Sequence, residues 1–118
     1  MKVELRLKNS SVRSGRYRQG ETECAVRLER QVGPLVRDAS GAFDWFDSAG
    51  RSYDAVGPVP PQYFNAQSFT RQIDQHLLKN GLDRVVVDLT GLSPTQRATV
   101  EVHIARLSAE QQMRIMVV

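Results

Sequence analysis

Two aspartates, Asp44 and Asp54, flank a tight turn in the sequence FDWFDSAGRSYDAVG (residues 43–57). The three-residue loop at 48–50 ends in glycine, which suits the left-handed position of a common hairpin loop. With this loop the two aspartates lie directly opposite each other, where like charges destabilise a strand pair. A divalent cation, a nearby Lys or Arg, or a proton kept by one acid would relieve that repulsion, and exposure of both to water would weaken it. A two-residue loop at 49–50 would instead offset the two acids.

The three-residue loop also predicts which side chains of the hairpin share a face of the sheet. One face would carry a largely aromatic set, Phe43, Trp45, Tyr53 and Ala55. The other face would carry the two aspartates beside Phe46, Ser52 and Val56. The pair of acids therefore falls on the face opposite the aromatic one.

A histidine and a lysine stand three residues apart in the sequence HLLK, so His76 and Lys79 are neighbours on the surface of a helix. Histidine can exchange a proton near neutral pH, and an ammonium group can hold a scissile phosphate. The pair is thus a candidate phosphate site. The structural alternative is a histidine at the border of the apolar face beside a surface lysine.

Asp88 and Thr90 end the apolar run VVVDLTG, where ligands of open α/β sheets commonly bind. Asp88 could bind a metal or orient His76, and Thr90 could contact phosphate. The alternative is a structural turn over residues 88–93. A second histidine, His103, lies in the middle of a predicted helix and is expected to be a satisfied structural residue.

The net charge of +3 over 118 residues and the pI of about 9.4 come from an uneven distribution of charge. The basic residues near the N-terminus, among them Arg13, Arg16 and Arg18, could follow a phosphate backbone, or belong to a solvated strand and loop. Tyr63 and its neighbours Gln62 and Asn65 could stack on or bond a base.

The single Cys24 excludes an internal disulfide and is expected to be a buried, inert thiol. No apolar run is long enough for a membrane span, and the N-terminus lacks the apolar core of a signal peptide. The sequence also contains no P-loop, no GxGxxG and no Ser–His–Asp pattern.

Hydrophobic periodicity and capping residues predict a single domain over residues 1–118, with a basic strand and loop at 1–19 and a core at 20–118. The expected elements are a strand at 2–7, a helix at 20–33, three short strands between 34 and 57, a helix at 65–81, a strand at 84–89, a helix at 94–107 and a strand at 113–118. This order is typical of a mixed α/β fold, or α+β, in which helices flank a central mixed sheet and the last two strands run parallel.

Two acids on adjacent strands, with an acidic helix before them and a helix and strand after them, resemble the PD-(D/E)xK nuclease superfamily. The resemblance implies that Asp44, Asp54 and a helical glutamate, Glu21 or Glu23, bind Mg²⁺, with Mn²⁺ or Zn²⁺ as alternatives. The lysine expected two residues after Asp54 is replaced by Val56, and Lys79 is the candidate substitute.

The motifs YDAVG, HLLK and VVVDLTGL, in that order within residues 43–118, resemble C-terminal toxin domains of bacterial contact-dependent inhibition and related polymorphic toxin systems. This resemblance implies a secreted or surface-delivered effector whose nuclease domain acts in the cytoplasm of the target cell, most often on tRNA. It also implies a cognate immunity protein. A barnase-like or colicin-like toxin fold, which works without metal through His, Lys and Thr, is the alternative.

The sequence therefore predicts an endonuclease toxin that cleaves RNA, with tRNA as the expected substrate and DNA as an alternative. The rival hypothesis is a non-catalytic module, either an immunity protein or a nucleic-acid adaptor. Immunity proteins for basic toxins are expected to be acidic, so the high pI argues against the first of these.

Overall fold

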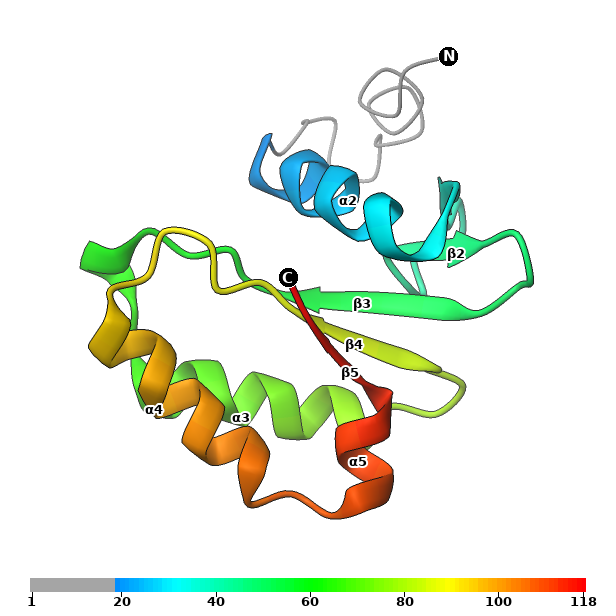
Figure 1. Cartoon of the computed structure of the whole chain (residues 1–118). Helices are drawn as coiled ribbons and strands as arrows, with labels where there is room; N and C mark the ends of the chain where they lie inside the picture. The colour runs from blue at the N-terminus through cyan, green and yellow to red at the C-terminus, as the bar shows by residue number, and fades with distance from the viewer. Residues whose placement is uncertain (1–18) are drawn as a thin grey trace.

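The computed structural model describes residues 19–118, so the predicted strand at 2–7 and the basic residues up to position 18 lie outside the described residues. The described elements follow one another as α2 (Gln19–Val32), β1 (Leu35–Arg37), β2 (Trp45–Asp47), β3 (Ser52–Val56), the short 3₁₀ helix η1 (Pro61–Tyr63), α3 (Ala66–Leu77), β4 (Arg84–Val87), α4 (Pro94–Ala105), α5 (Ala109–Arg114) and β5 (Ile115–Val117) (Figure 1). From residue 19 onward the predicted order of helices and strands is confirmed, and α5 is an additional short helix.

The five strands form one mixed sheet in the order β1-β2-β3-β4-β5. The first three strands are antiparallel, and β3, β4 and β5 are parallel. Helix α2 covers one face of the sheet, and α3, α4 and α5 lie on the other (Figure 1). The mixed α/β fold class and the parallel pairing of the last two strands are confirmed.

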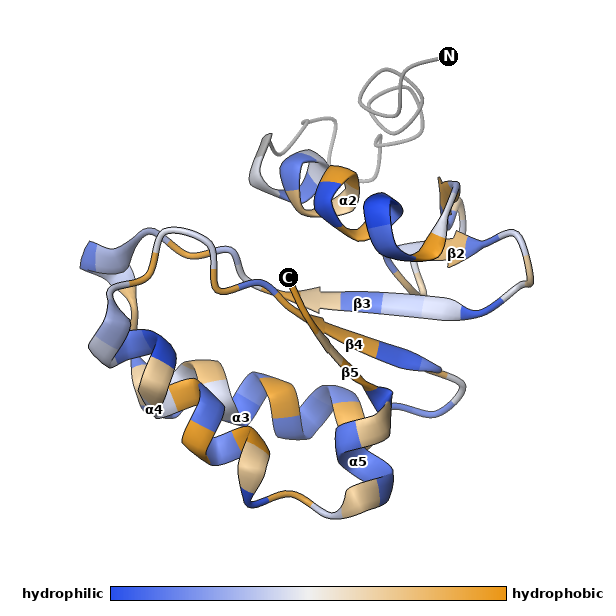
Figure 2. Cartoon of the chain, in the orientation of Figure 1, coloured by the Kyte–Doolittle hydropathy of each residue, from blue (hydrophilic) through white to orange (hydrophobic). Residues whose placement is uncertain are grey.

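The hydrophobic core has two layers because the central strand β4 is covered on both faces. Val85 and Val87 pack with Ile73 and Leu77 of α3, whereas Val86 packs with Leu28 of α2. In Figure 2 the end of β4 and all of β5 are coloured as hydrophobic, whereas the helices have mixed colouring and the start of β4 is hydrophilic. The sheet is therefore the element that holds α2 and α3 in fixed positions relative to each other.

The capping residues read from the sequence act as predicted on the α3 side of the sheet. Asn65 caps α3 by accepting from the amide of Ser68, and Ser93 forms a reciprocal capping box with Gln96 at the start of α4. Side-chain capping satisfies amides that have no partner inside the helix. The start of α3, and with it the face that carries His76, is thereby fixed.

The hairpin adopts the three-residue loop, with Gly50 in the left-handed region at φ +84°. Trp45 pairs with Tyr53, as the predicted register requires. Asp47 stabilises the loop by accepting hydrogen bonds from the Arg51 backbone and side chain and from the Tyr53 hydroxyl. Burial alone would raise the pKa of Asp47, but these hydrogen bonds lower it to about 2.

One part of the predicted face assignment is wrong. Trp45 and Tyr53 do pack beneath α2, but Phe43 packs against the cluster beneath α3. The reason is that β2 begins only at Trp45, so Phe43 belongs to the preceding loop and does not follow the alternation of the strand.

The ends of β3 and β4 approach closely at Gly57, whose φ is +83°. A Cβ atom at this position would lie 2.4 Å from the backbone carbonyl oxygen of Asp88. The amide of Asp88 bonds the carbonyl of Val56 at 2.9 Å, so the two strand ends cannot separate without loss of a ladder hydrogen bond. Only glycine fits here.

We expect Gly57→Ala to lower the free energy of unfolding by clearly more than Gly50→Ala does. Both residues have a positive φ, which costs an L side chain about 1–2 kcal/mol. A Cβ at Gly50 would meet nothing within 4 Å, whereas one at Gly57 meets backbone. Urea denaturation of the two variants measures the difference, and equal losses would contradict the close approach.

Candidate active site

A pocket of about 550 Å³ opens between the start of α2, the loop before β2, strand β3 and one face of α3. It brings together five of the residues predicted from the sequence: Glu21, Asp44, Asp54, His76 and Lys79. They come from four separate segments of the chain. The pocket is therefore the place where the hairpin and the HLLK helix meet, as the sequence predicts.

Asp54 lies in the middle of β3, and its side chain is only 4% exposed. Its Oδ1 accepts the amide of Asp44 at 2.8 Å, and its Oδ2 accepts Nζ of Lys79 at 2.5 Å. A buried carboxylate stays charged only if it is paired and hydrogen-bonded, and these two partners meet that requirement. Asp54 therefore joins β3, the loop before β2 and the end of α3.

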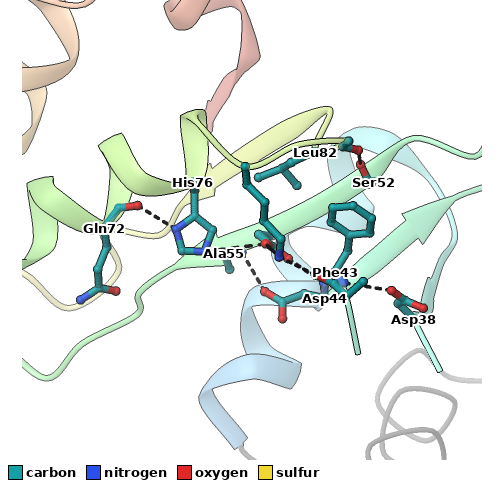
Figure 3. Close-up of polar contacts among 12 residues, drawn as sticks. Asp38, Phe43, Asp44, Ser52, Ala55, Gln72, His76 and Leu82 are labelled. Atoms are coloured by element: carbon teal, nitrogen blue, oxygen red, sulfur yellow. Dashed lines mark hydrogen bonds and ion pairs between the residues drawn. The ribbon is translucent and has the colours of Figure 1, made fainter. Parts of the chain in front are cut away.

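Asp44 lies beside Asp54, and each carboxylate has hydrogen-bond partners of its own. The regular pairing of β2 ends at Trp45, and Oδ2 of Asp44 accepts the amide of Ala55 at 2.9 Å (Figure 3). Each aspartate thus bonds a backbone amide contributed by the other strand. The structure shows one of the ways of relieving repulsion considered above, the nearby lysine, together with backbone amides.

Lys79 extends from the end of α3 across the pocket. Besides Asp54, Nζ bonds the carbonyl oxygen of Ala42 and lies 4.9 Å from the centroid of the Phe43 ring. Its side chain nevertheless remains 38% exposed. The ammonium group therefore holds the loop in place and is also accessible to a ligand that enters the pocket.

His76 points into the pocket with one nitrogen anchored. Its Nδ1 lies 2.7 Å from the carbonyl oxygen of Gln72, and Nε2 lies 3.7 Å from Oδ2 of Asp54 (Figure 3). A carbonyl oxygen can only accept, so Nδ1 must carry the proton. In the neutral ring, Nε2 therefore presents a lone pair to the pocket and can accept a proton there.

Of the two candidate helical glutamates, Glu21 lines the pocket and Glu23 does not. Glu21 lies in the first turn of α2, where the helix dipole favours a negative charge. Its Oε1 accepts Nη1 of Arg37 at 3.1 Å. The pocket is thus lined by three carboxylates, but among the residues described Lys79 is the one Lys or Arg that lines it.

The donor set of the pocket fits a hard divalent cation better than zinc. Mg²⁺ binds through one or two carboxylates, keeps several waters and contacts substrate phosphates, so Asp44 and Asp54 suffice. Zinc sites take three or four protein ligands. Within residues 19–118, no group of three His, Cys, Asp or Glu side chains is placed to hold a metal. Two carboxylates of the pocket therefore suit Mg²⁺ or Mn²⁺ better than Zn²⁺.

Asp88 is placed differently from what the sequence suggested. Its carboxylate is buried on the α2 face, where Oδ2 accepts Nη2 of Arg27 at 2.5 Å and Oδ1 accepts the amide of Thr90 at 3.0 Å. Burial alone would raise the pKa of Asp88, but the bonds from Thr90 and Arg27 hold it below its ordinary value. Neither Asp88 nor Thr90 lines the pocket, so Asp88 does not orient His76, and the turn over residues 88–93 is structural.

The remaining candidates lie away from the pocket or outside the described residues. His103 joins α4 to α3 through Asp74, as expected of a structural histidine, and Asn65 is occupied as the cap of α3. Tyr63 is 75% exposed in η1. Arg13, Arg16 and Arg18 lie outside the described residues.

Cys24 is a buried free thiol in α2, as predicted. Burial is the main cause that raises the pKa of this thiol, and the adjacent charge of Asp88 adds to the effect. A thiol with a raised pKa forms little thiolate and reacts slowly.

Sequence reasoning missed the residues that position the site. The backbone carbonyl oxygen of Gln72 holds the ring of His76, and the side chain of Arg37 holds the carboxylate of Glu21. The four-residue spacing of Gln72 and His76 was available as a signal, because residues i and i+4 are neighbours on a helix. No local sequence pattern predicts the role of Arg37, because its partner Glu21 lies sixteen residues earlier in the chain.

No helix within residues 19–118 combines the length and the apolar character that crossing a membrane demands.

Comparison with known proteins gives a match in structure but none in sequence. No protein-family model and no curated protein matches the chain. The fold is similar to that of a CdiA-CT toxin from Burkholderia pseudomallei E479, solved in complex with its cognate CdiI immunity protein. The TM-score is 0.70 and the identity 23%, over 85% of this chain and 98% of that chain. At this identity the likeness establishes a common fold.

We expect the two histidines of the chain to adopt opposite neutral tautomers. His76 should carry its proton on Nδ1, which bonds the carbonyl of Gln72, whereas His103 should carry it on Nε2, which lies 2.8 Å from Oδ1 of Asp74. Long-range ¹H–¹⁵N correlation spectra, recorded at a pH where both rings are neutral, distinguish the two forms. Identical tautomers would show that the described contact of His76 is absent in solution.

Proposed function

We propose that this domain is an endonuclease toxin that cleaves RNA, with tRNA as its substrate. The observation that carries the proposal is the pocket in which Asp54, Lys79 and His76 meet beside a second carboxylate, Asp44. Acid pairs with an adjacent lysine suit phosphodiester hydrolysis, because they combine cation binding, charge stabilisation and proton transfer. The likeness in fold to a CdiA-CT toxin supports the toxin part of the proposal, and the nuclease part rests on the residues of the pocket.

In this proposal Asp44 and Asp54 would hold Mg²⁺, with Glu21 bonding its waters, and the bound ion would supply an activated water and positive charge at the phosphate. Lys79 would contact a non-bridging phosphate oxygen, because its ammonium group is partly exposed and already faces the pocket. The lone pair on Nε2 of His76 would accept the proton of the attacking group. Gln72 would keep that nitrogen facing the substrate.

A metal-free mechanism is the alternative that the same residues allow. His76 would then take the proton from a ribose 2′-hydroxyl, whose oxygen attacks the adjacent phosphorus and displaces the 5′-oxygen of the next nucleotide. The displaced oxygen would take a proton from water, a 2′,3′-cyclic phosphate would remain, and Lys79 would stabilise the charge that develops on the phosphate. This route needs a 2′-hydroxyl and is therefore confined to RNA. The metal-dependent route is open to DNA as well, so the nature of the substrate and the need for a metal are linked.

We propose further that the domain is the toxic part of a larger effector, secreted or displayed at the cell surface, that acts in the cytoplasm of a target cell. The similar CdiA-CT toxin is bound to a cognate immunity protein, and we extend that relationship to this chain. A partner that covers the pocket would block the substrate. A non-catalytic adaptor is the rival hypothesis, but it does not explain why His76 is held with the lone pair of Nε2 facing the pocket.

RNA binding in this proposal depends on the N-terminal basic residues. Residues 19–118 contain ten Lys or Arg and twelve Asp or Glu, whereas residues 1–18 contain six Lys or Arg and one Glu. The excess of positive charge thus belongs entirely to the first 18 residues. Arg13, Arg16 and Arg18 would contact the phosphate backbone, and the exposed ring of Tyr63 would stack on a base.

The purified protein should cleave total RNA but not plasmid DNA, and EDTA should stop cleavage until excess Mg²⁺ is added. Asp54→Asn, His76→Ala and Lys79→Met should each reduce the rate at least about 100-fold, the scale of a lost acid–base or charge-stabilising group. Gel analysis of the products gives the rates, and circular dichroism checks the fold.

His103→Ala is the matched control, since it removes the other histidine of the chain and leaves the pocket intact. Activity that persists in EDTA, with 2′,3′-cyclic phosphate products, would select the metal-free mechanism. A wild-type protein that cuts neither nucleic acid, and that is readily expressed in bacteria without a partner gene, would support the binding module instead.

We expect replacement of Arg13, Arg16 and Arg18 by alanine to lower the affinity for RNA and also to make that affinity less dependent on salt concentration. Each lost phosphate contact on a single strand reduces the slope of log affinity against log salt by about 0.7, so three contacts would reduce it by about 2. Fluorescence anisotropy with labelled RNA over a salt series measures this slope. Alanine at Arg30 and Arg106, which are exposed residues of α2 and of the end of α4, removes charge elsewhere and should leave the slope unchanged. If both sets of variants behave alike, the contact is non-specific.

A further inference from the structure

Arg37 is buried beside the pocket at a position where its charge is only partly satisfied. Its side chain is 4% exposed, and Nη1 bonds Oε1 of Glu21 at 3.1 Å. Among the described residues, Nε and Nη2 have no hydrogen-bond partner although both atoms are buried. Leaving a buried charged donor unpaired is costly, so on stability alone this position favours an apolar side chain of similar size.

The position of Arg37 in the sheet explains which group it can act on. It lies directly opposite Trp45 in the pairing of β1 with β2, and Trp45 packs beneath α2. Directly opposed side chains share a face of the sheet, so Arg37 also points toward α2. It meets the first turn of that helix, where Glu21 is the acid that lines the pocket.

We propose that Arg37 is a positioning residue that holds the carboxylate of Glu21 toward the pocket. The guanidinium group uses one oxygen of Glu21, Oε1, which leaves the other oxygen available. Glu21 is 20% exposed and, without Arg37, could turn toward solvent. The inference rests on the proposed nuclease function, because the ligand of Glu21 would be the water shell of a divalent cation.

Arg37 pairs with an acid that lines the pocket, whereas Arg27, which also joins α2 to the sheet, does not. Arg27 uses both Nε and Nη2 to bond Asp88, an acid with no exposed surface and no place in the pocket. That pair can be explained by structure alone, since it neutralises a buried charge. The two arginines therefore provide a matched comparison between a structural pair and a positioning pair.

The experiment measures Mn²⁺ binding, RNA cleavage and stability on the same variants of the full chain. Arg37→Met should weaken Mn²⁺ binding, followed by the electron paramagnetic resonance signal of the free ion, by about 10–100-fold, the usual effect of losing a partner of a metal-site carboxylate. It should lower kcat with little change in KM for RNA, and Arg37→Lys should recover part of both losses.

The urea concentration at which each variant unfolds distinguishes a positioning role of Arg37 from a purely structural one. The double variant Arg37→Met/Glu21→Gln removes both charges and should unfold at the same or a higher urea concentration than wild type. Arg27→Met should lower stability and leave Mn²⁺ affinity unchanged, with Arg27→Lys as the milder form if the first does not fold.

Four results would overturn the inference. Wild-type Mn²⁺ affinity and kcat in Arg37→Met would show that Glu21 needs no positioning. Losses that follow the drop in stability equally in the Arg27 and Arg37 variants would show that only the docking of α2 matters. If wild-type protein cleaves RNA in EDTA and binds no Mn²⁺, the role of Arg37 is rejected and the proposed nuclease function is kept. If wild-type protein neither cleaves RNA nor binds Mn²⁺, both proposals are rejected.

Discussion

The buried carboxylate of Asp54 is the constraint on which the arrangement of the pocket depends. A charge in the middle of a central strand must find partners, and Asp54 takes one from the amide of Asp44 and one from the ammonium group of Lys79. The first contact fixes where β2 begins, and the second fixes the end of α3 against the sheet. The loop before β2 is held in turn, because Lys79 also bonds the carbonyl of Ala42.

The sheet carries a second buried aspartate whose surroundings have the opposite character. Asp88 follows β4 and is enclosed on the α2 face, where Arg27 and the backbone of Thr90 occupy its oxygens. Asp54 lies on the α3 face, beside a pocket and beside a lysine that solvent reaches. Both carboxylates are paired, so pairing alone does not distinguish a structural acid from a functional one. Solvent access distinguishes the two acids, because a ligand in the pocket can reach Lys79 and compete with Asp54 for it. The carboxylate of Asp88 has no exposed surface at which a ligand could compete for Arg27.

Much of this arrangement could be predicted from the sequence because it depends on local chemistry. The glycine at position 50 fixes the loop and thereby the register of the hairpin. His76 and Lys79 both line the pocket, although α3 ends at Leu77, short of the predicted Gly81, and Lys79 lies in the turn after the helix. Strand alternation fails for Phe43, since it lies before the first paired residue of β2. The roles of Asp88 and Arg37 could not be predicted, because each depends on a partner in α2 that only tertiary packing brings near.

The charge of the pocket links these observations to the choice of mechanism. Among the described residues that line the pocket, Glu21, Asp44 and Asp54 face one lysine, so these residues alone offer a phosphodiester little net attraction. In the proposed nuclease, positive charge beyond that of Lys79 would come from a cation held by the carboxylates, from a protonated His76, or from the basic residues near the N-terminus. Of these sources, the hard carboxylate oxygens of Asp44 and Asp54 favour the cation in the proposed mechanism.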